Sequence, residues 1–161
     1  MTVEVIEADL SRPAHADAVL DLLNCYAQEP EGGGAGLGEQ VKRDLMPALQ
    51  RRPDALVLLA MQDGEAVGLL NAFEGFSTFA AAPLLNVHDV YVRPMLRGKG
   101  VARALFEYAE RAARRRGCCK MTLEVLNGNL PAQRLYRALG FDAYALEGMG
   151  HALFWQKKLG L

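Results

Sequence analysis

The chain has 161 residues, of which 51% are hydrophobic and 23% charged, and its formal net charge is −1. This length and composition predict one globular domain over residues 1–161, and the near-zero charge argues against a nucleic-acid-binding protein. No apolar run reaches the roughly 18 residues that a membrane span needs, and the first residues lack a signal-peptide pattern, so we expect a cytoplasmic protein.

The first third of the chain predicts a short strand and two helices. Residues 3–7 form the strand, and a helix over about 15–27 follows from apolar residues at helical spacing. The segment 29–38 contains five glycines, which predicts a flexible loop, either a mobile lid near a substrate pocket or a slack connector. Apolar residues between positions 41 and 49 suggest a second helix, which Pro47 should kink or interrupt.

A hairpin comes next. Residues 56–61 form a β-rich apolar run, and Asp63-Gly64 is a strong turn signal before another strand that extends to about Phe79. Gly68 and Gly75 mark bends or bulges in that strand.

A fourth strand is predicted over residues 84–92, and it contains several polar candidate site residues. Alternation along a strand sends successive side chains to opposite faces. It therefore places His88, Val90 and Val92 on one face, and Asp89 and Tyr91 on the other.

The last third predicts a helix from Gly100 to Gly117, a strand over 120–125, a helix over 130–139 and two final strands over 141–145 and 151–158. The basic cluster on the first of these helices reads as a solvated face; it consists of Arg111, Arg114, Arg115 and Arg116. The order of elements predicts a mixed sheet with helices on both faces, an α/β (α+β) fold.

The strand-to-helix junction at residues 97–102 is a candidate phosphate site. Gly98 and Gly100 remove side chains where a ligand would approach backbone amides at a helix start, and Arg97 and Lys99 add positive charge. The spacing fits neither a Walker loop nor a dinucleotide fingerprint. The same glycines could also serve only as a turn.

Two motifs, read together, resemble the GNAT superfamily of acetyl-CoA-dependent N-acetyltransferases. They lie between Asp89 and Phe141, and the order of predicted elements extends the resemblance over the whole chain. The first is Arg97-x-x-Gly100-x-Ala102 after Val90-Tyr91-Val92; the second is Asn129-x-x-Ala132-x-x-Leu135-Tyr136 followed by Leu139-Gly140-Phe141.

The resemblance implies a mixed, mostly antiparallel seven-stranded sheet in which strands 4 and 5 splay apart, with acetyl-CoA as the cosubstrate. Backbone amides of residues 97–102 would hold the pyrophosphate, and the splayed edge would pair with the pantetheine arm as with a strand. Asn129 would contact that arm, and it could also cap the following helix. The implied cofactor-binding residues are Val90, Tyr91, Val92, Arg97, Gly98, Lys99, Gly100, Val101, Ala102, Asn129 and Ala132.

The resemblance also implies direct attack of an amine on the thioester in a ternary complex, with the amide of Val92 stabilising the oxyanion. Tyr136 would protonate the leaving CoA thiolate, because a tyrosine with a pKa of about 10 stays protonated at neutral pH. The alternative is a tyrosine of the core or rim. No cysteine has a paired histidine that would make it a nucleophile.

Three residues compete for the role of base. Glu124 resembles, in its setting, the base of the ribosomal-protein N-terminal acetyltransferases, although a strand glutamate is usually a solvated charge. Diamine acetyltransferases often carry a Glu-Asp pair where this chain has His88-Asp89, so a polyamine substrate is in doubt. A lone histidine on an apolar strand is more often packed than catalytic.

The predicted acceptor is a small-molecule amine or a peptide amine, either an N-terminus or a lysine. The alternatives are an idle acetyl-CoA-binding module, transfer to a hydroxyl, or transfer of a longer acyl chain. Pairing of the last strand, with Phe154 and Trp155, would favour a homodimer. We expect no metal site, because the histidines are scattered and the odd set of Cys25, Cys118 and Cys119 lacks metal-binding spacing.

Overall fold

The computed structural model describes residues 3–160 and divides the chain into two compact units, of which the first ends at Leu123 and the second begins at Glu124. The first unit contains β1 (Glu4–Glu7), α1 (Pro13–Gln28), the 3₁₀ helix η1 (Pro30–Gly32), α2 (Glu39–Gln50), β2 (Ala55–Gln62), β3 (Glu65–Ser77), β4 (Ala82–Val92), the 3₁₀ helix η2 (Pro94–Leu96), α3 (Val101–Arg115) and β5 (Met121–Leu123). The second unit contains α4 (Leu130–Ala138), β6 (Ala145–Leu146) and β7 (Gly150–His151).

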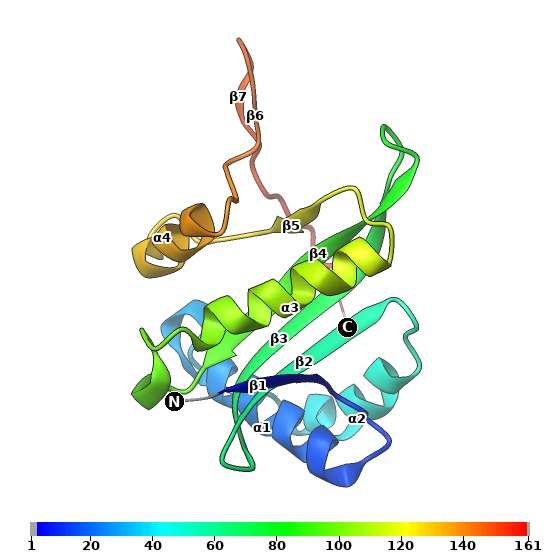
Figure 1. Cartoon of the computed structure of the whole chain (residues 1–161), viewed down its shortest axis with the longest axis vertical. Coiled ribbons are helices and arrows are strands. Elements are labelled where there is room, and N and C mark those ends of the chain that lie inside the picture. Colours follow the sequence, from blue (N-terminus) through cyan, green and yellow to red (C-terminus); the bar gives the residue numbers. More distant parts are fainter. Residues whose placement is uncertain (1–2, 161) are drawn as a thin grey trace. The chain divides into compact units, whose positions relative to one another are not determined.

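The first unit is built on a five-stranded sheet in the order β1-β2-β3-β4-β5 (Figure 1). Strands β1 to β4 pair antiparallel and β5 pairs parallel with β4. Asp63 and Gly64 join β2 to β3 with φ values of 51° and 84°, the left-handed turn that a two-residue hairpin requires. The predicted α/β (α+β) fold with a mostly antiparallel sheet is confirmed. The single seven-stranded sheet is wrong, because β6 and β7 pair in a separate two-stranded sheet.

Helices cover both faces of the five-stranded sheet, as predicted (Figure 1). On one face α3 approaches β3 so closely that a Cβ at Gly68 would lie 3.0 Å from Val101 Cγ1 and 3.2 Å from Leu105 Cδ1. This close approach fixes the position of the loop that precedes α3. On the other face α1 and α2 enclose a core that includes Leu22 and Leu59, both fully buried. Burial of each such leucine stabilises the fold by about 1.5–3 kcal/mol.

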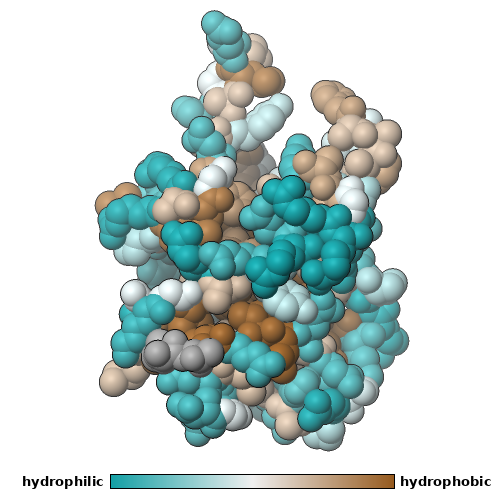
Figure 2. All heavy atoms as spheres, viewed as in Figure 1, coloured by the Kyte–Doolittle hydropathy of each residue, from teal (hydrophilic) through white to brown (hydrophobic). Residues whose placement is uncertain are grey.

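The outer side of α3 is polar. Figure 2 shows hydrophilic side chains over this helix, and Arg111, Arg114 and Arg115 are exposed. Arg114 pairs with Glu110 one turn away at 2.6 Å, and Arg115 reaches Glu7 at 3.5 Å. The basic residues therefore form a solvated, ion-paired face, as the sequence indicates.

Strand β4 contains a β-bulge that was not predicted from the sequence. Ala72 of β3 pairs with Val87, but its neighbour Asn71 pairs with Asp89, so His88 is an extra residue in β4. An extra residue interrupts the alternation of faces. The His88 ring consequently packs edge-on against Phe73, on the face that carries α1, with a centroid distance of 5.6 Å. The prediction that His88 faces away from Asp89 is therefore wrong.

The glycine-rich segment between α1 and α2 is more ordered than predicted. Residues Pro30–Gly32 form η1, and a Cβ at Gly32 would lie 2.0 Å from the carbonyl oxygen of Tyr26. Farther on, the Leu37 amide donates to Asn24 Oδ1 at 2.9 Å, and the Leu37 side chain packs against the core. Close packing and side-chain hydrogen bonds hold this loop, which glycine content alone cannot reveal.

Two further expectations need correction. α2 continues through Pro47 to Gln50 without interruption, since a proline in the last turn removes only one helical hydrogen bond. The two final strands are much shorter than predicted, with two residues each in β6 and β7. None of the helices among residues 3–160 is long and apolar enough to cross a bilayer.

Candidate active site

Strands β4 and β5 diverge in the middle of β4. They pair only over Leu85–Val87 and Met121–Leu123, whereas β4 runs on to Val92. The Arg93 amide donates to the β3 residue Val67 at 2.9 Å, so the amide of the preceding residue, Val92, points away from β3. In the part of the chain that the structure describes, no strand pairs with this edge of β4 beyond Val87. The amides of Val90 and Val92 therefore face a strand edge that an extended ligand can join.

The loop between β4 and α3 presents bare backbone. Gly98 and Gly100 have φ values of 73° and 86°, and a Cβ at either position would meet no atom within 4 Å. No side chain caps α3 at Gly100. Among residues 3–160, no backbone carbonyl accepts from the amides of Gly98, Lys99 or Gly100. The amide of Arg97, however, already donates to the Pro94 carbonyl at 3.2 Å. The amides that can bind an anion thus begin at Gly98 and continue into the first turn of α3.

The Arg97 side chain turns inward rather than toward this loop. Its Nε donates to the Val92 carbonyl at 3.0 Å, and its guanidinium lies 5.7 Å from the centre of the Tyr91 ring. It also forms an ion pair with Glu29, which immediately follows α1. Arg97 therefore joins the end of β4 to the α1–α2 loop, and exposed Lys99 is left as the cationic side chain of the loop before α3.

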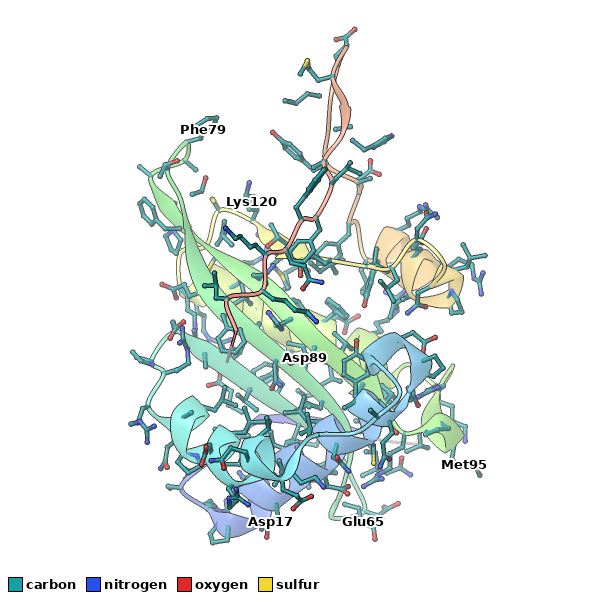
Figure 3. All side chains as sticks on the ribbon, turned by 180° about the vertical axis from the view of Figure 1, so that it is seen from behind. Asp17, Glu65, Phe79, Asp89, Met95 and Lys120 are labelled. Atoms are coloured by element: carbon teal, nitrogen blue, oxygen red, sulfur yellow. The ribbon has the colours of Figure 1, made fainter. Side chains whose placement is uncertain are left out.

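A polar cluster lies on the sheet face that carries α1 and α2, at the β4 bulge. Asn71 is buried at 3% exposure and donates through Nδ2 to Asp89 Oδ2 at 3.1 Å. His88 Nδ1 lies 3.8 Å from Asp89 Oδ1. Figure 3 shows Asp89 on this face, near the helices that cover its lower half. The bulge thus brings His88 and Asp89 to the same face.

Tyrosines border this cluster. Tyr26 of α1 and Tyr91 of β4 have ring centroids 6.3 Å apart. Burial, and then the charges of Asp89, Glu31 and Glu29, raise the pKa of the Tyr26 hydroxyl. Burial is also the main cause of a raised pKa at Tyr91. Both hydroxyls therefore remain protonated donors at neutral pH.

Sequence reasoning did not single out Asn71. The available signal was a polar residue in the middle of an otherwise apolar run, Leu69-Leu70-Asn71-Ala72-Phe73. Such a residue must find a partner when buried, and its partner on the neighbouring strand became visible only with the register.

The second unit contains the remaining predicted site residues. Glu124 is exposed, directly after β5. Asn129 caps α4, since its Oδ1 accepts from the Ala132 amide at 3.2 Å, so its predicted capping role is confirmed. Tyr136 is half-buried, and its ring packs edge-on against Phe141 at 6.1 Å. This short helix therefore holds Asn129 and Tyr136 in a fixed relation to each other.

Comparisons with known proteins point in one direction. The family model of the acetyltransferase (GNAT) family matches residues 17–141. Streptothricin acetyltransferase from Streptomyces lavendulae is 40% identical over 89 residues, which cover 55% of this chain and 46% of that protein. Aminoglycoside N(6')-acetyltransferase type 1 from Salmonella typhimurium is 29% identical over 87 residues, covering 52% of this chain and 60% of that protein. The chain thus spans about half the length of the curated relatives it matches.

A solved structure agrees in fold. An aminoglycoside N-acetyltransferase in complex with CoA superposes with a TM-score of 0.75 at 19% identity, covering 98% of this chain and 95% of that chain. At this identity the likeness concerns the fold alone. It extends over both compact units, and the predicted GNAT-like architecture is confirmed.

Proposed function

The chain belongs to the acetyltransferase (GNAT) family, and we propose that it transfers an acetyl group from acetyl-CoA, the cosubstrate of this family, to the amine of a small molecule. The proposal rests on two features taken together. One is the edge of β4 that has no strand partner among the described residues, and the other is the loop before α3, where glycines leave the backbone uncovered. The loop suits a pyrophosphate and the edge suits an amide-bearing arm, and CoA contains both groups in one molecule.

Cofactor binding follows from these two features. The amides from Gly98 to Ala102 would hold the pyrophosphate, with Lys99 adding charge, while Val90 and Val92 would pair with the pantetheine arm. Asn129 has its Oδ1 engaged in the cap, so its Nδ2 is the atom left to donate to the cofactor. A cytoplasmic location is part of the proposal, and the free cysteines, which are typical of a reducing compartment, support it.

The proposed reaction is direct attack of the neutral amine on the thioester carbon in a ternary complex. The Val92 amide, which points away from β3, would donate to the oxyanion, and loss of such a donor costs about 10²–10³-fold in rate. As the C–S bond breaks, Tyr136 would give its proton to the CoA thiolate. Glu124 would accept the proton of the amine, and His88 and Asp89 remain alternative bases.

The proposed acceptor is a small amine of the kind that the relatives' names give, streptothricin or an aminoglycoside. Both types of molecule are cations, and the carboxylates of Asp89, Glu29 and Glu31 lie around Tyr26 on the α1 face of the sheet. Peptide N-termini and lysines are the second class of acceptor to test.

A screen of acceptors tests the function. The purified protein is mixed with acetyl-CoA and, in turn, streptothricin, aminoglycosides, linear polyamines and peptides, and free thiol is followed against time. We expect thiol release that requires an amine and is fastest with the antibiotic amines. If no amine releases thiol although calorimetry shows that CoA binds, the proposal is wrong and the chain is a binding module.

A further inference from the structure

We propose that Asp89 and Asn71 form a subsite for an ammonium group of the acceptor other than the amine that reacts, with Asp89 making the contact and Asn71 positioning it. This inference rests on the proposed function. It specifies the acceptor as a molecule with at least two amino groups, and it assigns a role to Asn71.

The first observation is an unpaired atom. Asn71 is 3% exposed, and its Nδ2 donates to Asp89 Oδ2 at 3.1 Å. A carboxylate can only accept, so this bond fixes the orientation of the amide and turns Oδ1 away from Asp89. Within residues 3–160, Asn71 Oδ1 has no hydrogen-bond partner although it is buried. A buried acceptor without a donor lowers stability, so the amide is better explained by its action on Asp89 than by a contribution to the core.

The second observation is the state of the Asp89 carboxylate. Its side chain is 26% exposed, and none of the lysines or arginines among the described residues forms an ion pair with it. Its nearest basic group is His88 Nδ1, at 3.8 Å. Asn71 holds Oδ2, so Oδ1, the oxygen that lies near His88 Nδ1, is the one left to accept from a ligand. A carboxylate that is fixed by a neutral amide and lacks a cation is prepared to receive one.

The surroundings favour a positive group. Tyr26 stays protonated because burial and the charges of Asp89 and Glu31 raise the pKa of its hydroxyl. Glu31 is exposed and forms no ion pair in the part of the chain that the structure describes. Phe73 and His88 stack edge-on beside Asp89 and give the subsite one aromatic wall. Negative potential beside an aromatic wall suits an alkylammonium group.

The group bound there is not the reacting amine. Contact with a carboxylate favours the charged form of an amine, whereas attack on a thioester requires the neutral form. An ammonium group has three donors and no acceptor, so it can donate directly to Asp89 Oδ1. The subsite therefore orients a diamine or polyamine and leaves another of its amines for chemistry.

The test compares two acceptors with one skeleton, a diamine and the analogue in which one amino group is replaced by hydroxyl. Steady-state kinetics are measured for the unaltered protein, Asp89→Asn, Asn71→Leu and the control Asp54→Asn, which removes an equal charge at a similarly exposed position. Thermal midpoints and KM for acetyl-CoA are measured in parallel.

We expect Asp89→Asn to raise KM for the diamine about tenfold or more, by a much larger factor than KM for the monoamine, and to leave KM for acetyl-CoA unchanged. Asn71→Leu should raise the same KM by a smaller factor while its thermal midpoint stays equal or rises, because the unpaired oxygen is gone. Asp54→Asn should change neither KM.

Three results would overturn the inference. If Asp89→Asn lowers kcat equally for both acceptors, Asp89 is the base and not a subsite. If Asn71→Leu lowers the thermal midpoint and leaves the diamine KM unchanged, Asn71 is only structural. If Asp89→Asn changes nothing while the unaltered protein acetylates the diamine, the subsite is absent but the proposed function stands. Absence of transfer to any amine by the unaltered protein would instead overturn the function itself. Asp89→Asn alters a part-exposed position and tests the subsite independently of how Asn71→Leu folds.

Discussion

At the scale of single residues, the proposed chemistry depends on a hydroxyl and a carboxylate in the second unit, those of Tyr136 and Glu124. Tyr136 is half-buried and its ring packs edge-on against Phe141, which restricts the ring. A positioned acid of this kind contributes about 10²–10⁴-fold to a rate. Glu124 is exposed, so the proposed role as base would rest on proton transfer through water rather than on a desolvated carboxylate.

Replacement of Tyr136 by phenylalanine tests the acid. The variant Tyr136→Phe should lower kcat about 10²-fold, because the thiolate leaves without a proton, and should leave KM for acetyl-CoA unchanged. Tyr144→Phe, at an exposed tyrosine of the same unit, is the matched control and should behave like the unaltered protein. Equal kcat values for both variants would remove Tyr136 from the mechanism.

Replacement of Glu124 by glutamine tests the base. The loss in kcat/KM should be larger for an alkylamine with a pKa of about 10.4 than for an α-amine of about 7.7–8.0, because the latter already contains more neutral amine at neutral pH. The measurement is the pH–rate profile with each acceptor. A loss of the same size for both amines would argue that Glu124 acts in binding, and Asp89 or His88 would then be the better base.

The two tyrosines of the α1 face predict a limit to alkaline stability. The folded-state pKa of Tyr26 and that of Tyr91 are raised, mainly by burial, above the usual value of about 10. A raised folded-state pKa means that the stabilisation is fully present below pH about 10 and is lost as pH rises toward the folded-state pKa. Chemical unfolding between pH 8 and about 11 should therefore show falling stability. The double variant Tyr26→Phe/Tyr91→Phe should flatten this decline, and an unchanged slope would contradict it.

What the sequence predicted well at this scale was local. Gly98 and Gly100 could be identified because positive φ at a helix start selects glycine wherever it occurs, and the structure has it at both. Asn71 and the orientation of His88 could not be identified. Both depend on which residue of β3 lies opposite which residue of β4, and one extra residue in β4 changes that register.

At the scale of elements, one ion pair links the loops that would hold the two substrates. Glu29 follows α1, and Arg97 precedes α3 and also donates to the Val92 carbonyl. The pair is partly exposed, so its contribution to stability is small, about 0–1 kcal/mol. Its effect should instead appear in how the α1–α2 loop is placed beside the end of β4.

The variant Glu29→Gln separates position from stability. We expect KM for the acceptor to rise about threefold to tenfold with less than about 1 kcal/mol change in unfolding free energy, because the loop loses its tie to Arg97. The control is Glu39→Gln, which breaks the ion pair with Lys42 at the start of α2. If both variants leave the acceptor KM unchanged, the loop is placed by its packing alone.

Element prediction succeeded where periodicity is strong. The apolar stripes of α1 and α3 identified both helices, since an amphipathic helix carries its own burial pattern. It failed for the final strands, which were expected over residues 141–145 and 151–158, whereas the structure pairs only Ala145–Leu146 with Gly150–His151. A β-strand forms only when it hydrogen-bonds to a partner strand, and the local sequence does not identify that partner. The homodimer predicted through this segment stays a prediction.

At the scale of the whole molecule, the fold class followed from the order of elements and from two motifs that are far apart in the sequence. The arrangement of seven strands in two sheets did not follow from them. The family match over residues 17–141 covers most of the first unit and the beginning of the second. We propose that the chain acts as one catalytic domain, because the family match continues across the boundary between the two units.

The proposed activity of this protein is transfer of an acetyl group from acetyl-CoA to an amine. The most direct measurement is mass spectrometry of an antibiotic amine after incubation with the protein and acetyl-CoA labelled in the acetyl carbonyl. We predict a product that carries the labelled acetyl group as an amide, with one equivalent of free CoA for each product molecule. Free CoA accompanied by labelled acetate and an unchanged amine, or label attached as an ester, would contradict it.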